Sequence, residues 1–182
     1  MTNEIFISVD VETAGPIPGE YSLLSIGACL VHDDQKTFYT ELKPINFKAV
    51  PQALEVSGLS LEVLKKNGQD PILAMKALSQ WLSTLPPNKE DKFVFVGFNA
   101  AFDWSFINYY FHKFIGGNPF GFTALDIKSY YMGATGCNWN DTRSSQIALK
   151  LNPKSKSDHN ALQDAKYQAE VFRLIEKHIS SQ

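Results

Sequence analysis

The sequence predicts an α/β fold in which helices flank a mixed five-stranded sheet, and the order of its patterns supports this. Three apolar, β-branched runs come first, and helical repeats then alternate with two short apolar runs. Such an order implies a mixed sheet covered by helices. The expected strands cover residues 4–12, 21–32, 36–44, 92–98 and 122–127.

The first half of the chain is expected to form a hairpin and then helices. A tight polar turn at Asp33 and Asp34 would join the second and third strands as an antiparallel pair. Residues 51–66 follow as helical pieces interrupted at Gly58. A longer helix over residues 71–85 begins with proline, which is favoured in a first turn. Its predicted buried side consists of Ile72, Met75, Leu78, Leu82 and Leu85.

Two further helices are expected in the second half. One begins near Asn99, a suitable N-cap, and stops at the glycine pair 116–117. Asp126 is expected to cap the short helical pieces that lead to Leu151, and a final helix covers about 160–179. Their predicted inner sides are Phe102, Phe106 and Tyr110 on the first helix, and Ala161, Ala165, Phe172 and Ile179 on the last.

Length and composition indicate one soluble domain over residues 1–182. Hydrophobic residues make up 44% of the chain and charged residues 20%, as in ordinary globular proteins. The first residues lack a basic segment followed by an apolar stretch, and no run is long enough to span a membrane. Cys29 and Cys137 show no metal-ligand spacing. We therefore expect a cytoplasmic protein that does not associate with membranes.

The charge balance limits how the protein could hold a nucleic acid. The 17 basic and 19 acidic residues give a net charge of −2. A protein that holds long nucleic acid by its backbone usually has a basic surface. If this chain acts on nucleic acid, it should engage few phosphates at a time.

The first strand carries two carboxylates in an otherwise apolar run. Because side chains two residues apart on a strand share a face, Asp10 and Glu12 lie side by side. Asp103 is expected in the first turn of a helix. Asp164 lies on the final helix, and His159 should lie on the loop just before it, because five helical positions would separate the two side chains.

Four converging acids would repel one another unless cations lay between them. Carboxylate oxygens suit Mg²⁺ or Mn²⁺. A pair of such ions can stabilise both the attacking and the leaving oxygen of a displacement at phosphorus. A histidine, with an ordinary pKa of about 6.5, suits the base that takes a proton from the attacking water.

The segments "DVET", "NAAFD" and "HNALQD" resemble, in order, the three motifs of the DEDDh exonuclease superfamily. That superfamily includes proofreading subunits, ribonuclease T and oligoribonuclease. The match extends from Phe6 to Phe172. The tyrosine-type alternative would have tyrosine at position 160, where this chain has Asn160. Two departures from the pattern, Phe98 before the second motif and Ala14 after the first, remove no expected ligand.

The resemblance implies a ribonuclease H-like fold with the first strand central, and a metal-dependent 3′→5′ exonuclease that releases nucleoside 5′-monophosphates. It assigns two divalent cations, Mg²⁺ or Mn²⁺, to Asp10, Glu12, Asp103 and Asp164. His159 would be the general base. The expected partner is the 3′ end of single-stranded or short DNA or RNA, and a homodimer is one implied assembly because several relatives are homodimers.

Contacts to the terminal nucleotide are implied for Thr13, Ala14 and Phe102, although the helical spacing of Phe102 fits core packing equally well. Lys154 and Lys156 either touch phosphates or are solvated. Two other functions remain open at this point. One is an endonuclease on the same fold, and the other is a module that binds nucleic acid without cutting it.

Overall fold

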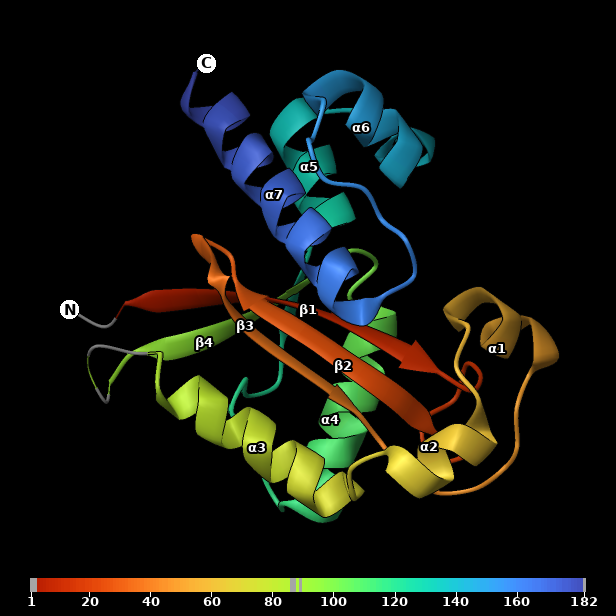
Figure 1. The fold of residues 1–182 in the computed structure, drawn as a ribbon. Coiled ribbons are helices and arrows are strands. Elements are labelled where there is room, and N and C mark those ends of the chain that lie inside the picture. Colours follow the sequence, from red (N-terminus) through yellow and green to blue (C-terminus); the bar gives the residue numbers. More distant parts are fainter. Residues whose placement is uncertain (1–2, 86–87, 89, 182) are drawn as a thin grey trace.

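The computed structural model describes residues 3–85, 88 and 90–181, and these form one mixed sheet of five strands (Figure 1). The strand order is β3-β2-β1-β4-β5, so the first strand is central, as expected. Strand β2 pairs antiparallel with both β1 and β3, while β4 runs parallel to both β1 and β5. The strands are β1 (Glu4–Thr13), β2 (Leu23–Leu30), β3 (Asp33–Glu41), β4 (Lys92–Gly97) and β5 (Ala124–Asp126).

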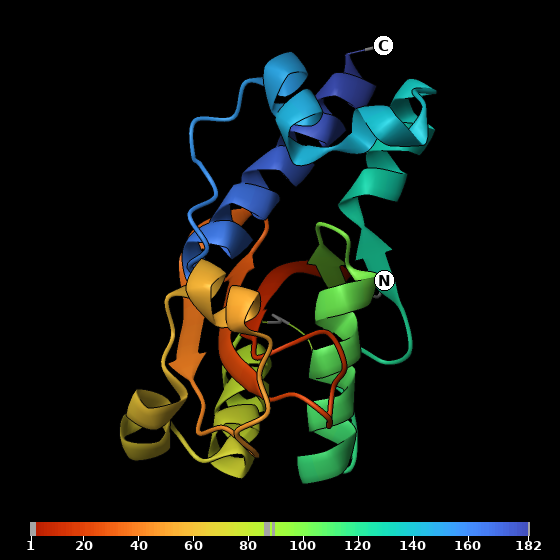
Figure 2. The same ribbon diagram turned by 90° about the vertical axis from the view of Figure 1, so that its right-hand side faces the viewer.

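Helices cover both faces of the sheet, with α3 and α4 on one side and α5 and α7 on the other (Figures 1 and 2). In the described chain the helices are α1 (Pro51–Ser57), α2 (Leu61–Asn67), α3 (Pro71–Ser83), α4 (Ala101–Phe114), α5 (Ile127–Thr135), α6 (Ser144–Leu151) and α7 (Ala161–Ser180), with a 3₁₀ turn at Trp139–Thr142. Gly58 ends α1 in a left-handed conformation, which is the break expected there.

The two faces of β1 have different roles. Ile7, Val9 and Val11 are buried in the core formed with α3 and α4. Because side chains alternate along a strand, Asp10 and Glu12 lie on the opposite face, toward α7. The central strand therefore contributes apolar residues to one core and carboxylates to the other face.

The hairpin turn lies two residues earlier than expected. The chain reverses at Val31 and His32, and β3 already begins at Asp33, so the predicted turn at Asp33–Asp34 was wrong. Val31 is fully buried, and its N–H donates to the carbonyl of Phe6 at 2.9 Å. Asp34 accepts a hydrogen bond from Arg173 on α7 at 2.9 Å. These contacts with β1 and α7 fix the turn.

The start of α4 also differs from the expectation. Asn99 has a positive φ of 63°, and the cap position is Ala100, which makes no side-chain cap hydrogen bond. Instead, Asp126 Oδ2 accepts the N–H of Ala100 at 2.9 Å. The other oxygen of Asp126 accepts the N–H of Ser129 at 2.8 Å, which confirms its predicted N-cap role for α5.

Two apolar residues of the predicted inner sides are exposed. Ile72 is 42% exposed and Ile179 is 39% exposed, whereas Met75 and Ile175 are fully buried. Ile72 lies in the first turn of α3 and Ile179 in the last turn of α7, so core packing does not extend to these two helix ends. Within the described residues, no helix is both long and apolar enough to cross a membrane.

Candidate active site

The two carboxylates of β1 lie near the end of that strand. In the antiparallel pairing with β2, Asp10 is opposite Gly27 and Glu12 is opposite Ser25. The register shifts between Glu12 and Thr13, which marks an irregularity where the strand ends. Both carboxylates are partly buried on the face that α7 covers.

Gly27 allows α7 to approach that face closely. A Cβ atom at Gly27 would lie 2.1 Å from the backbone carbonyl carbon of Ala161, the first residue of α7. Only glycine leaves room for this contact between backbone and strand. Asp164 lies three residues further along α7, close to one turn. The missing side chain at Gly27 thus brings Asp164 toward Asp10 on the neighbouring strand.

Asp103 reaches the site from the opposite helix layer. It lies in the first turn of α4 and is 5% exposed. Its Oδ1 accepts the backbone N–H of Val11 at 3.0 Å. The parallel pairing of β1 with β4 ends at Ser8 and Val96, so Val11 lies beyond it. The side chain of Asp103 therefore satisfies a strand donor that β4 does not reach, and this bond ties α4 to β1.

His159 lies on the loop before α7, as expected, and Asp164 contacts this loop. Asp164 is 7% exposed, and its Oδ1 accepts the N–H of Asp158 at 2.9 Å. His159 is exposed and has a φ of 61°. One ligand atom each from Glu12, His159 and Asp164 lie within 4.8 Å of one another.

Gln168 is a site residue that the sequence analysis missed. Its Nε2 donates to Asp10 Oδ1 at 2.6 Å, and its Oε1 accepts the N–H of Phe98 at 3.0 Å. The amide therefore connects the end of β4 to the carboxylate on β1. The spacing could have revealed it, because Gln168 follows Asp164 by four residues and so shares its helix face.

The acids raise one another's pKa values. Burial, followed by the charges of Asp103, Asp164 and Glu12, raises the pKa of Asp10 well above its usual range. Burial and then the charge of Asp164 raise the pKa of Glu12 to about 7. Burial raises the pKa of Asp103 to about 7, although the hydrogen bond from Val11 opposes this. The cluster therefore favours either protons or added positive charge.

A cavity of about 200 Å³ opens at this cluster. It is lined by Asp10, Phe98, Ser144, Ser157, His159, Asp164, Tyr167 and Gln168.

The residues expected to touch a nucleotide do not line this cavity. Phe102 is partly buried and packs against Phe106, with 5.4 Å between ring centroids. Thr13 is buried, and its hydroxyl donates to the carbonyl of Gly15. Ala14 is fully buried in a small cluster with Leu24.

Known proteins share both the sequence pattern and the fold. A family model described as the 3′–5′ exoribonuclease Rv2179c-like domain matches residues 5–176. The chain belongs to this family. It is also 58% identical over 175 residues to the 3′–5′ DNA exonuclease Cap18 of Escherichia coli, a match that covers 96% of this chain and 92% of Cap18.

Solved structures confirm the ribonuclease H-like fold of this Rv2179c-like chain. The nuclease domain of 3′hExo, a DEDDh family member bound to rAMP, has a TM-score of 0.74 at 15% identity, covering 95% of this chain and 92% of that domain. E. coli Exonuclease I in complex with a dT13 oligonucleotide also has a TM-score of 0.74, at 16% identity. The match covers 98% of this chain and 42% of the Exonuclease I chain. The chain is a DEDDh-type 3′–5′ exonuclease, a phosphodiester hydrolase.

The donor set of this family member fits divalent cations. Hard carboxylate oxygens from three separate parts of the chain converge, and burial keeps water from screening them. Among the described residues, the ion pairs with Lys or Arg involve other acids. The four carboxylates of the cluster, on Asp10, Glu12, Asp103 and Asp164, therefore have no basic partner there. The charge that would balance the cluster is therefore expected from bound cations.

Proposed function

We propose that this exonuclease removes nucleotides stepwise from the 3′ end of single-stranded or short nucleic acid and releases nucleoside 5′-monophosphates. The observation that carries the proposal is the convergence of Glu12, His159 and Asp164 within 4.8 Å, beside the carboxylate of Asp10. The high identity to the DNA exonuclease Cap18 supports DNA as the preferred substrate over RNA.

The proposed cofactors are two divalent cations, Mg²⁺ or Mn²⁺, held by Asp10, Glu12, Asp103 and Asp164. When bound, such cations increase the acidity of water and neutralise charge on phosphoryl oxygens. The protein's own contribution is to hold the carboxylates in place. Gln168 orients Asp10 through its 2.6 Å hydrogen bond, and the N–H of Val11 orients Asp103.

His159 is the proposed general base. Its neutral imidazole accepts a proton from the attacking water as the water oxygen bonds to phosphorus. The bond between phosphorus and the 3′ oxygen of the preceding nucleotide breaks, and that oxygen takes up a proton from solvent. The phosphate therefore stays on the released nucleotide as a 5′-phosphate. The exposed position of His159 lets its proton pass to water afterwards.

The terminal nucleoside is proposed to lie against Thr13, Ala14 and Phe102. Among these, the partly exposed ring of Phe102 can stack on a base, which holds a single-stranded end without reading its sequence. The buried Thr13 and Ala14 would shape the pocket floor. We also propose that residues 1–182 form one exonuclease domain, and that a homodimer is an assembly to test by light scattering.

The decisive experiment is digestion of matched, 5′-labelled DNA and RNA oligomers from two nucleotides upward. With Mg²⁺ or Mn²⁺ we expect a ladder that shortens from the 3′ end, faster on DNA, and no products in EDTA. Asp164→Asn and His159→Ala should lose activity while staying folded. Early internal fragments would instead indicate an endonuclease, and binding without metal-stimulated turnover would indicate a binding module.

A further inference from the structure

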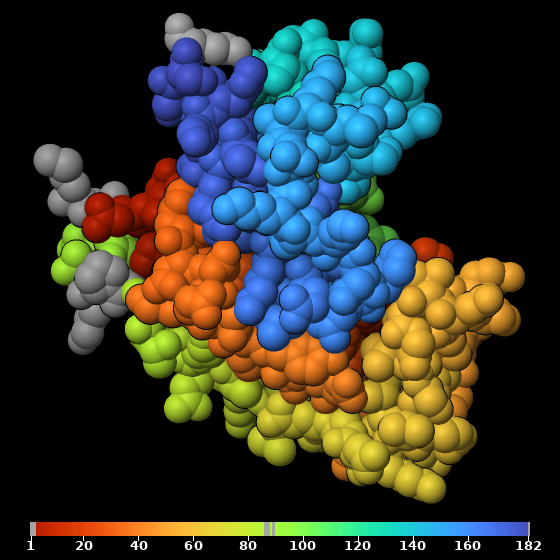
Figure 3. Space-filling view, turned by 45° about the horizontal axis from the view of Figure 1, so that its top comes forward, coloured from red at the N-terminus to blue at the C-terminus, as the bar shows by residue number. Residues whose placement is uncertain are grey.

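The loop that carries His159 has little support of its own. Residues 152–160, between α6 and α7, contain no helical or strand residue. The segment lies on the surface over α7, beside the hairpin of β2 and β3 (Figure 3). His159 has a positive φ of 61°, which non-glycine residues hold only where the surrounding structure fixes them. Inside the loop, the N–H of Asn160 donates to Asp158 Oδ1 at 3.2 Å, and contacts from outside the loop add to this local bond.

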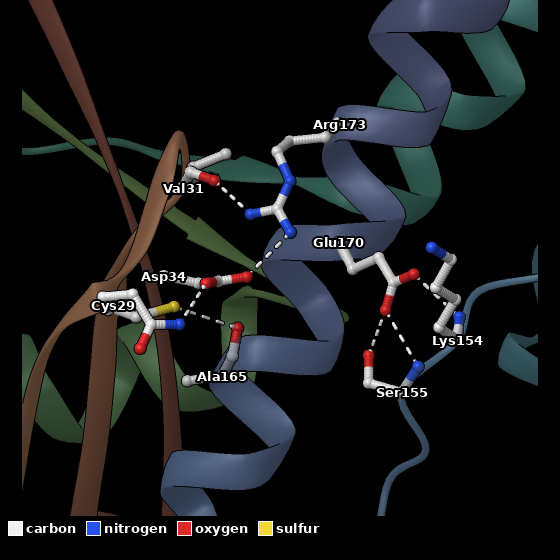
Figure 4. A network of polar contacts seen from close by, with 9 residues as sticks. Cys29, Val31, Asp34, Lys154, Ser155, Ala165, Glu170 and Arg173 are labelled. Atoms are coloured by element: carbon white, nitrogen blue, oxygen red, sulfur yellow. Dashed lines mark hydrogen bonds and ion pairs between the residues drawn. The ribbon is translucent and has the colours of Figure 1, made fainter.

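Glu170, six residues after Asp164 on α7, holds the loop at its start. Its Oε1 accepts the backbone N–H of Lys154 at 2.7 Å, and its Oε2 accepts that of Ser155 at 2.9 Å (Figure 4). The Ser155 hydroxyl also donates to Oε2. Both oxygens are thus used, and hydrogen bonds to an ionised acceptor are stronger than neutral ones.

The charge of Glu170 persists at neutral pH. Burial opposes ionisation, but the hydrogen bonds from Lys154 and Ser155 and the nearby charge of Arg173 hold the pKa of Glu170 below its usual value. Arg173, one turn further along α7, donates to the carbonyl of Val31 and to Asp34 (Figure 4). The helix that holds the loop is therefore itself fixed to the β2–β3 turn.

We propose that Glu170 is a positioning residue that anchors the loop so that the His159 imidazole faces the carboxylates. The inference rests on the proposed role of His159 as base. The loop has a second anchor, the bond from Asp158 to Asp164, but Asp164 is also a proposed cation ligand. Glu170 lies outside the carboxylate cluster, so its bonds persist whatever occupies that cluster.

The test compares Glu170→Ala and Glu170→Gln with Glu176→Gln as a matched control. Glu176 also lies on α7, but its Oε1 lies 3.8 Å from His32 Nε2, away from the loop. In Glu170→Ala, hydrogen exchange of the Lys154 and Ser155 amides should accelerate. We expect kcat to fall by about tenfold to a hundredfold, the cost of a misplaced catalytic group, with KM within about twofold. Glu170→Gln keeps one acceptor oxygen, so its kcat and its amide exchange should lie between those of the wild type and Glu170→Ala.

A double mutant separates positioning from general loss of structure. In a His159→Ala background, adding Glu170→Ala should reduce kcat by less than about twofold, because residues that act as a unit are not additive. The proposal is overturned if Glu170→Ala keeps kcat within twofold of the wild type or if the loop amides stay protected. It is also overturned if Glu170→Ala reduces kcat by the same factor in the His159→Ala background as in the wild type. Should Glu170→Ala not fold, the isosteric Glu170→Gln carries the same comparisons.

The result is distinguishable from failure of the proposed function. Amide exchange of the loop is measured without substrate or cations, so it reports the anchor directly. Full activity in His159→Ala would remove the base from the proposed mechanism, whatever the exchange of Lys154 and Ser155 showed.

Discussion

At the residue scale, Asp10 is held where its charge is unfavourable without cations. Burial and three neighbouring acids raise its pKa, and Glu12 shows the same effect with a pKa of about 7 against an ordinary 4.5. A carboxyl with a raised folded-state pKa stabilises the fold at low pH, and that stability is lost as pH rises through the folded-state value. For Glu12, the free energy of unfolding of the cation-free protein should therefore fall between pH 4.5 and about 7.

Asp10→Asn should be more thermostable than the wild type in EDTA at pH 8. Asn Oδ1 can still accept from Gln168, while the repulsive charge is gone. Each kcal/mol gained raises the melting temperature by about 2–4 °C in a domain of this size. At pH 5 the difference should shrink, because burial and the neighbouring acids raise the pKa of Asp10 and a larger fraction of it is protonated there than at pH 8. Differential scanning fluorimetry at both pH values measures this.

The same variant should lose exonuclease activity by more than about a hundredfold, since even outer partners of metal sites cost up to that much. Asp91→Asn, in the segment just before β4, is a control that removes a carboxylate outside the cluster. A clear drop in the melting temperature of Asp10→Asn at pH 8, or an equal gain at both pH values, would contradict the repulsion between the acids.

At the scale of elements, the contact between α7 and β2 places half of the site. Gly27→Ala would put a Cβ atom 2.1 Å from the backbone of Ala161, so the first turn of α7 must move away from the sheet. Overpacking of this kind costs about 1–3 kcal/mol. Because Asp164 and the His159 loop move with that turn, we expect lower kcat as well as a lower melting temperature.

Gly133→Ala provides the matched control. Gly133 lies within α5, and a Cβ atom there would meet nothing within 4 Å. The exchange should be neutral or stabilise the protein by up to about 1 kcal/mol through helix propensity. Urea unfolding and steady-state kinetics of both variants test the argument. Wild-type stability and kcat in Gly27→Ala would show that α7 does not depend on this glycine.

The elements themselves could be predicted because their signals are local. The apolar, β-branched runs predicted all five strands, and Gly58 correctly predicted the break between α1 and α2. What failed depends on partners far along the chain. The start of α4 is set by Asp126, which comes 26 residues after the Ala100 amide it accepts from. The hairpin turn moved because Val31 is bound to β1.

The same distinction holds for the site. The five DEDDh residues follow from short motifs, and the structure brings their elements together at the carboxylate cluster. Gln168 and Glu170 carry no motif, because an amide and an acid on an amphipathic helix are ordinary. Their importance comes from Asp10, 158 residues away from Gln168, and from a loop 15 and 16 residues before Glu170.

At the scale of the whole molecule, charge sets how firmly a substrate strand is held. The net charge is −2, and the site adds acids where the scissile phosphate must lie. Basic residues do gather elsewhere, since Lys154, Lys166, Arg173 and Lys177 line a surface cavity of about 630 Å³ beside the His159 loop. Asp34 and Glu170 in the same lining offset part of that charge.

We therefore predict a weak salt dependence of KM on single-stranded substrates. For a single strand, each phosphate contact contributes about 0.7 to the slope of log affinity against log salt. With one or two contacts, KM of a ten-nucleotide oligomer should rise by less than about sevenfold between 50 and 200 mM KCl at fixed Mg²⁺. A rise of about fiftyfold, the value for four contacts, would contradict this. If the larger rise were found, Lys166→Ala and Lys177→Ala should reduce the slope. Such a reduction would show that the substrate strand binds along the surface cavity that these two lysines line.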